Sequence, residues 1–107
     1  MEEHEIDLHR LKKLCEDHYV LYLYTFGSFA LPSYNPHNDV DLLVQFEPNQ
    51  TFDYFENYMN FKDHLSAFFH KRIDLIEVQT LKNPVLKAKL AKTIKRLYGK
   101  PYEEISF

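Results

Sequence analysis

Residues 24–44 read YTFGSFALPSYNPHNDVDLLV. An apolar strand ends at the small pair Gly27-Ser28, a loop rich in Pro and Asn follows, and a second apolar strand opens with Asp39 and Asp41. Side chains alternate along a strand, so these two carboxylates share one face, with Cα atoms roughly 6–7 Å apart. At that spacing the two carboxylates can bind one divalent cation together, or each can bind one of two cations. The stretch predicts two neighbouring strands with a metal site where the second begins.

Gly27 and Ser28 add a second indication. Glycine lets the backbone approach a ligand closely, and Ser28 can offer an N–H and a hydroxyl to a phosphate at a helix start. Together with the carboxylates, this turn favours metal–nucleotide chemistry.

Composition limits the class of protein. The 107 residues predict a single domain over 1–107, and a hydrophobic content of 45% with 16% aromatics is typical of a folded core. The net charge of −3 argues against direct nucleic-acid binding. We expect no membrane span, since no apolar stretch approaches the necessary length, and the single cysteine, Cys15, suits a cytoplasmic protein.

Hydrophobic periodicity predicts an α/β (α+β) fold, a short mixed sheet flanked by helices. Capping and turn residues place the helix boundaries, with Thr51 as the N-cap of the long helix, and Asn83-Pro84 and Gly99 bounding the last one. The predicted helices cover residues 5–18, 51–70 and 84–98, and the predicted strands cover 20–26, 39–46 and 72–78.

A third carboxylate, Asp74, lies inside the apolar strand Arg72-Ile73-Asp74-Leu75-Ile76. An unpaired buried charge is costly, whereas a nearby divalent cation compensates it. Asp74 is therefore predicted to join Asp39 and Asp41 at one edge of the sheet, with Gly27 and Ser28 across from them.

The combined motif, Gly27-Ser28 followed by Asp39-Val40-Asp41 and a later Asp74, resembles the active-site signature of the polymerase-β-type nucleotidyltransferases. The short chain resembles their minimal, MNT-domain members. This resemblance implies that Asp39, Asp41 and Asp74 are catalytic and bind Mg²⁺ or Mn²⁺, that Asp74 is also the base toward an acceptor hydroxyl, and that Gly27 and Ser28 hold the phosphates of ATP.

The resemblance also implies a partner. MNT proteins are typically antitoxins of HEPN-domain toxins, and some transfer AMP from ATP to a toxin tyrosine. The alternative is a non-catalytic antitoxin that neutralises its toxin by binding, with a degenerate nucleotide site. A nucleotidyltransferase acting on a small molecule would be a third reading, for which the chain shows no second domain.

One departure from the family pattern bears on activity. The usual Arg-Gly after the Gly-Ser-x-Ala segment is replaced by Leu31-Pro32, which removes a cation near the triphosphate and stiffens the loop. Arg72 or a lysine of the last helix could replace this charge.

The long helix carries two apolar stripes, and one is enough to cover a three-stranded sheet. The sequence leaves open whether both belong to the core or whether the second meets another chain, as a homo-oligomer or a docked toxin. The first stripe contains Phe52, Phe55, Met59, Ser66 and Phe69; the second, the candidate interface, contains Tyr54, Tyr58, Phe61, Leu65 and Phe68.

Overall fold

The fold was derived from a computed structural model that describes residues 7–26, 39–48 and 53–99. The elements follow in the order α1 (Leu8–Asp17), β1 (Val20–Phe26), β2 (Val40–Phe46), α2 (Tyr54–Phe69), β3 (Ile73–Glu77), the 3₁₀ turn η2 (Val78–Thr80), α3 (Pro84–Thr93) and β4 (Lys95–Gly99).

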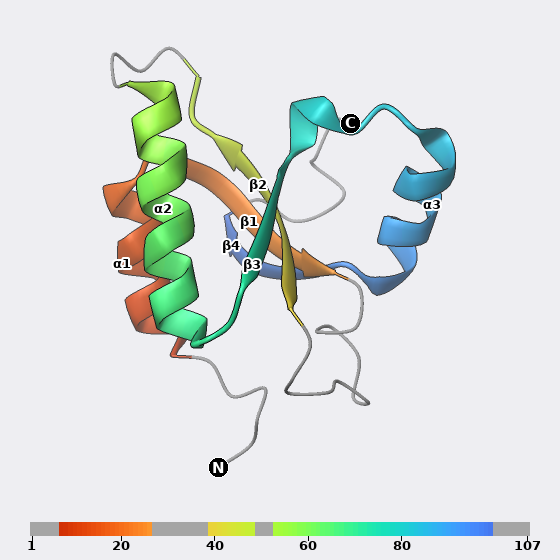
Figure 1. The fold of residues 1–107 in the computed structure, drawn as a ribbon. Coiled ribbons are helices and arrows are strands. Elements are labelled where there is room, and N and C mark those ends of the chain that lie inside the picture. Colours follow the sequence, from red (N-terminus) through yellow and green to blue (C-terminus); the bar gives the residue numbers. More distant parts are fainter. Residues whose placement is uncertain (1–6, 27–38, 49–52, 100–107) are drawn as a thin grey trace.

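A four-stranded sheet in the order β3-β2-β1-β4 forms the centre of the molecule (Figure 1). β1 pairs antiparallel with both β2 and β4, whereas β2 pairs parallel with β3. The parallel pair requires a crossover, and α2 supplies it. The predicted mixed sheet flanked by helices is confirmed.

α1 and α2 lie side by side on one face of the sheet, and α3 lies on its other side (Figure 1). The strand residues facing α1 and α2 alternate along β2 and β3, because successive side chains point to opposite faces. This larger core contains Leu11, Cys15, Val20, Leu23, Val40, Leu42, Val44, Phe46, Phe61, Leu65, Ile73 and Leu75. A second cluster contains Tyr22, Tyr24, Phe26, Leu43, Val78 and Leu81.

Aspartates cap both helices of the main layer. Asp7 accepts a hydrogen bond from the N–H of Arg10, and Asp53 accepts one from the N–H of Glu56. The prediction of Thr51 as the cap of the long helix was wrong, since Asp53 has the same capping chemistry and the helix begins directly after it.

The predicted final helix was also wrong in its second half. α3 ends at Thr93, and residues 95–99 form a fourth strand along β1. The pairing gives β1 a hydrogen-bonded neighbour on its second edge. Gly99 adopts a φ of +87° there, and a Cβ on it would lie only 2.2 Å from the carbonyl oxygen of Leu21. The glycine that reads as a helix end is needed for close strand packing.

The two stripes of α2 are assigned by burial. Phe61 and Leu65, from the second stripe, are 0% exposed, whereas Phe55, from the first, is 74% exposed. Phe61 and Leu65 therefore face the sheet, and the prediction that these two residues form an intermolecular contact was wrong. This helix must cover β2 and the parallel β3, so the face carrying Phe61 and Leu65 turns inward.

Among the described helices, none is both long and apolar enough to cross a membrane.

Candidate active site

Asp41 and Asp74 are brought together by the parallel pairing of β2 and β3. They are direct partners in the register, between the pairs Val40–Ile73 and Leu42–Leu75. Neighbouring strands lie roughly 4.8 Å apart, and side chains of paired residues point to the same face. The two carboxylates, separated by 33 positions in the chain, are thus adjacent.

Asp39 precedes β2 and is exposed. The ladder extends to its neighbour, because the N–H of Val40 donates to the carbonyl of Arg72 at 3.0 Å. Asp39 therefore lies at the end of the sheet where β3 also begins. Its charge reaches Asp41, whose pKa it helps to raise.

These carboxylates occupy the face of the sheet opposite α1 and α2. Val40 and Leu42 pack in the larger core below the helices, so Asp41 between them points the other way. By the same alternation Asp74 lies between Ile73 and Leu75 and shares that face. Asp74 is exposed, so the expectation that its charge is buried was wrong. Folding thus places both carboxylates on the face opposite α1 and α2, the face that also carries the smaller apolar cluster around Leu43.

The electrostatics of Asp41 fit a cation site. Burial raises the pKa of its carboxyl group, and the negative charges of Asp74 and Asp39 raise it further. A carboxylate that is partly desolvated and repelled by two others would gain from a divalent cation. Oxygen ligands of this kind suit Mg²⁺ or Mn²⁺.

Within residues 7–26, 39–48 and 53–99, no group of three or more acidic, His or Cys side chains is arranged closely enough to hold a metal ion as it stands. Asp41 and Asp74 are nevertheless direct partners in the strand register, and Asp39 precedes β2 at the same end of the sheet. The backbone register brings the candidate oxygen ligands to one end of the sheet, and their side chains would have to turn toward one another to coordinate an ion.

Gly27 and Ser28 lie outside the described residues. β1 ends at Phe26, which pairs with Asp41 in the antiparallel ladder. The Thr25 hydroxyl donates to the carbonyl oxygen of Asp41 at 3.2 Å and fixes β1 against β2 at this position. The strand that leads into the Gly27-Ser28 segment therefore ends beside the carboxylates.

Tyr58 supports the edge strand, a role that periodicity did not reveal. Its hydroxyl donates to the carbonyl oxygen of Leu75 at 2.6 Å, one residue beyond Asp74. Burial, followed by the charges of Glu77 and Asp74, raises the pKa of the Tyr58 phenol. In the sequence Tyr58 is one of several aromatic residues in a helical stripe. Its hydrogen bond to a backbone carbonyl cannot be predicted from the sequence, because every residue has such a carbonyl.

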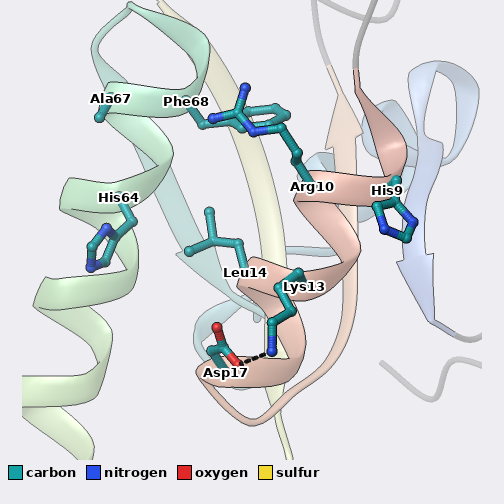
Figure 2. Close-up of a pocket in the computed structure, with 8 residues that line it drawn as sticks. All are labelled: His9, Arg10, Lys13, Leu14, Asp17, His64, Ala67 and Phe68. Carbon is teal, nitrogen blue, oxygen red and sulfur yellow. Dashed lines mark hydrogen bonds and ion pairs between the residues drawn. The ribbon is translucent and has the colours of Figure 1, made fainter.

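An open groove lies elsewhere, on the outer surface between α1 and α2, with a volume of about 560 Å³ (Figure 2). We call it the α1/α2 groove; the residues that define it are Arg10, Lys13, Leu14, Asp17, His64 and Phe68. It lies on the helical side of the molecule, away from Asp41 and Asp74.

Comparison with known proteins assigns the family. The family model described as "Polymerase beta, Nucleotidyltransferase" matches residues 9–103. A Methanocaldococcus jannaschii protein named "Putative protein adenylyltransferase MJ1379" is 30% identical over 81 residues, covering 75% of this chain and 80% of its own length. A second protein of that organism, MJ0128, has the same description and is 32% identical over the same shares of the two chains.

Solved structures share the fold. A toxin–antitoxin structure with AMP-PNP contains a chain that superposes with a TM-score of 0.67 at 20% identity, covering 92% of this chain and 77% of that one. A chain of the complex of a tri-AMPylated Shewanella oneidensis HEPN toxin with its MNT antitoxin gives 0.57 at 21% identity, covering 87% and 70%. A chain described as a "putative minimal nucleotidyltransferase" gives 0.62 at 26% identity, covering 85% and 96%. With the family match over nearly the whole length, these findings show that the chain belongs to the polymerase-β nucleotidyltransferase family.

Proposed function

We propose that this protein transfers AMP from ATP to a hydroxyl group, that of a tyrosine on a HEPN-domain toxin, and so acts as the toxin's antitoxin. The observation that carries the proposal is the parallel register of Asp41 with Asp74 on the face of the sheet opposite α1 and α2, with Asp39 at the same end. Its relatives are named protein adenylyltransferases, and its structural neighbours include an MNT antitoxin bound to an AMPylated HEPN toxin. These names support the choice of nucleotide and partner.

The three carboxylates have distinct proposed roles. Asp39 and Asp41 would hold the divalent cation together with the triphosphate. Asp74 would also help to bind divalent metal and would accept the proton of the attacking hydroxyl. The hydroxyl oxygen forms a bond to the α-phosphorus, and the bond to pyrophosphate breaks. When bound, Mg²⁺ would neutralise the phosphate charge and align the reacting oxygens.

Gly27 and Ser28 are proposed to hold the β- and γ-phosphates through backbone N–H groups and the Ser28 hydroxyl. Leu31 stands where the family commonly has arginine. We propose that Arg72 supplies this cation, since it is exposed and adjoins the first residue of β3 at the carboxylate end of the sheet. An exposed guanidinium can bind phosphate oxygens in a bidentate manner.

A second candidate is a non-catalytic antitoxin that acts by contact with the toxin. The replacement of the loop Arg-Gly by Leu31-Pro32 favours it, because a stiffer loop with one cation fewer would bind the triphosphate less tightly.

The decisive experiment combines nucleotide binding with mass analysis of the toxin. Isothermal titration calorimetry with ATP should show binding that requires Mg²⁺ and that is lost in the double variant Asp39→Asn plus Asp41→Asn. Incubation of the wild type with a candidate HEPN-domain toxin, ATP and Mg²⁺ should then add one or more AMP groups to a toxin tyrosine, as intact-mass and fragment spectra can show.

The variant Asp74→Asn separates binding from chemistry. It should retain much of the ATP affinity and lose AMP transfer, because it lacks the proposed base. Neutralisation of the toxin without any mass increase would favour the non-catalytic alternative. Unchanged ATP binding in the Asp39/Asp41 double variant would contradict the assigned site itself.

A further inference from the structure

The α1/α2 groove has an apolar floor. Leu14 of α1 and Phe68 of α2 are only partly buried and pack against the larger core from the outside. Figure 2 shows the Leu14 side chain between the two helices. Binding of a partner that removes this apolar surface from water is favourable.

Arg10 is held across this floor. Its guanidinium carbon lies 5.4 Å from the centre of the Phe68 ring, and Figure 2 shows the side chain reaching from α1 over the ring. Stacking fixes the guanidinium plane and leaves its N–H edges available to an acceptor. Within the described part of the chain, no carboxylate forms an ion pair with Arg10.

Lys13 extends the cationic side of the groove. Its ammonium lies 3.4 Å from an Asp17 carboxylate oxygen, with the two side chains 75% and 55% exposed. An ion pair so exposed contributes little, so an incoming carboxylate can replace Asp17 at small cost. His64 lies on the α2 side, and its ring centre is 5.2 Å from that of His18.

We propose that the α1/α2 groove binds an acidic, partly apolar segment of a partner protein. A Glu or Asp side chain of that segment would pair with Arg10 and Lys13, and a neighbouring Leu or Phe would cover Leu14 and Phe68. An amphipathic helix fits such a groove because its residues at i and i+3 or i+4 lie on one face.

The features of the groove favour a peptide over a nucleic acid. Arg10 covers a face of Phe68, so the ring offers less of the open surface on which bases stack. Two cationic side chains in a groove that also contains Asp17, on a chain of net charge −3, fall short of the basic surface that a phosphate backbone requires.

The test is an NMR titration of the ¹⁵N-labelled full chain with a blocked helical peptide that carries alternating Glu and Leu on one face. Resonances of Arg10, Lys13, His64 and Phe68 should shift in a saturable manner at peptide concentrations up to about the millimolar range typical of weak contacts. The same peptide with Lys in place of Glu should leave these resonances unchanged.

Charge-reversal variants identify the site. Arg10→Glu with Lys13→Glu should weaken binding at least ten-fold, whereas Asp17→Asn should tighten it by freeing Lys13. The matched control, Lys12→Glu with Lys92→Glu, changes the net charge equally at exposed positions outside the groove and should retain binding. Circular dichroism verifies the fold of each variant.

The proposal is overturned by the absence of saturable shifts in the groove, by equal weakening in the two charge-reversal pairs, or by equal binding of the Lys peptide. A single-stranded oligonucleotide that shifts the groove resonances more strongly than the Glu peptide would also overturn it.

Discussion

At the scale of single residues, Asp41 experiences burial together with the charges of two other carboxylates. Burial raises its pKa most, and Asp74 and then Asp39 raise it further. Thr25 and the ladders to β1 and β3 hold its backbone in place, so the side chain remains beside these charges. Such repulsion weakens the fold in the absence of a cation and is relieved when one binds.

We expect Asp41→Asn to raise the melting temperature of metal-free protein at neutral pH. In the wild type the pKa is higher in the folded state than in the unfolded state, so the stability present below the unfolded pKa is lost as the pH rises through the folded pKa. Asparagine does not ionise and avoids this loss.

Differential scanning calorimetry in EDTA between acidic and neutral pH measures the effect. The advantage of the variant should shrink toward the acid end, below the ordinary carboxyl pKa of 3.8. Adding Mg²⁺ should stabilise the wild type more than the variant. A variant that melts lower than the wild type at neutral pH in EDTA would contradict the assigned repulsion.

At the scale of elements, α2 shows how one helix divides its aromatic residues. Its Phe61 and Leu65 fill the space above β2 and β3, whereas Phe55 faces solvent. Two hydrogen bonds tie the first half of α2 to the rest of the fold: the Asn57 side chain donates to the carbonyl of His18 at 2.8 Å, and the Tyr58 hydroxyl donates to the carbonyl of Leu75. The helix thereby fixes the edge strand that carries Asp74.

Phe61→Ala should destabilise the protein by about 3–5 kcal/mol, as truncation of a buried phenylalanine does, because the ring is fully buried against Phe46 and the larger core. Phe55→Ala is the matched control and should change the free energy of unfolding by less than about 0.5 kcal/mol. Urea denaturation followed by circular dichroism measures both. Similar small losses in both variants would show that Phe61 is not in the core.

β4 depends on its final glycine. Gly99→Ala should cost more than the roughly 1–3 kcal/mol of a strained backbone conformation, because the new Cβ would also lie within 2.7 Å of the Cα and Cβ of Tyr22. Hydrogen exchange should show lost protection along β4 and the adjoining edge of β1. Unchanged protection of these amides would argue against the close packing of β4 on β1.

At the scale of the whole molecule, the sheet separates two surfaces. Asp41 and Asp74 lie on the face of β2 and β3 opposite α1 and α2, whereas the α1/α2 groove lies on the helical side of the molecule. Among the residues that the structure describes, none belongs to both surfaces, so ligands at the two need not compete.

The two surfaces should therefore respond independently to mutation. Arg10→Glu with Lys13→Glu should leave Mg²⁺-dependent ATP affinity within about two-fold of the wild type, since mutations at distant sites without shared partners are usually additive. Asp39→Asn with Asp41→Asn should leave binding of the Glu peptide unchanged to the same degree. Calorimetry and the NMR titration measure the two affinities, and a loss of both in either variant would contradict the separation.

Much of this architecture was predictable from local patterns. The span of β1 was predicted to the residue, whereas the shared face of Asp39 and Asp41 stays a prediction, because β2 begins only at Val40. The mixed sheet and the family follow from the same stretch together with Asp74. These features depend on residues close together in the sequence, so the two-residue period of strands and the 3.6-residue period of helices can reveal them. The roles of Asp39, Asp41, Asp74, Gly27 and Ser28 in catalysis remain predictions.

Only the tertiary structure decided which distant residues meet. The register that pairs Asp41 with Asp74, the burial of Phe61 rather than Phe55, and the fourth strand in place of a longer helix all arise from contacts between separate segments. A stripe of aromatics has the same period whether it faces a sheet or water, and residues 95–99 become a strand because β1 offers a free edge. Hydrophobic periodicity is a property of a single segment, whereas burial and strand pairing depend on contacts between two segments.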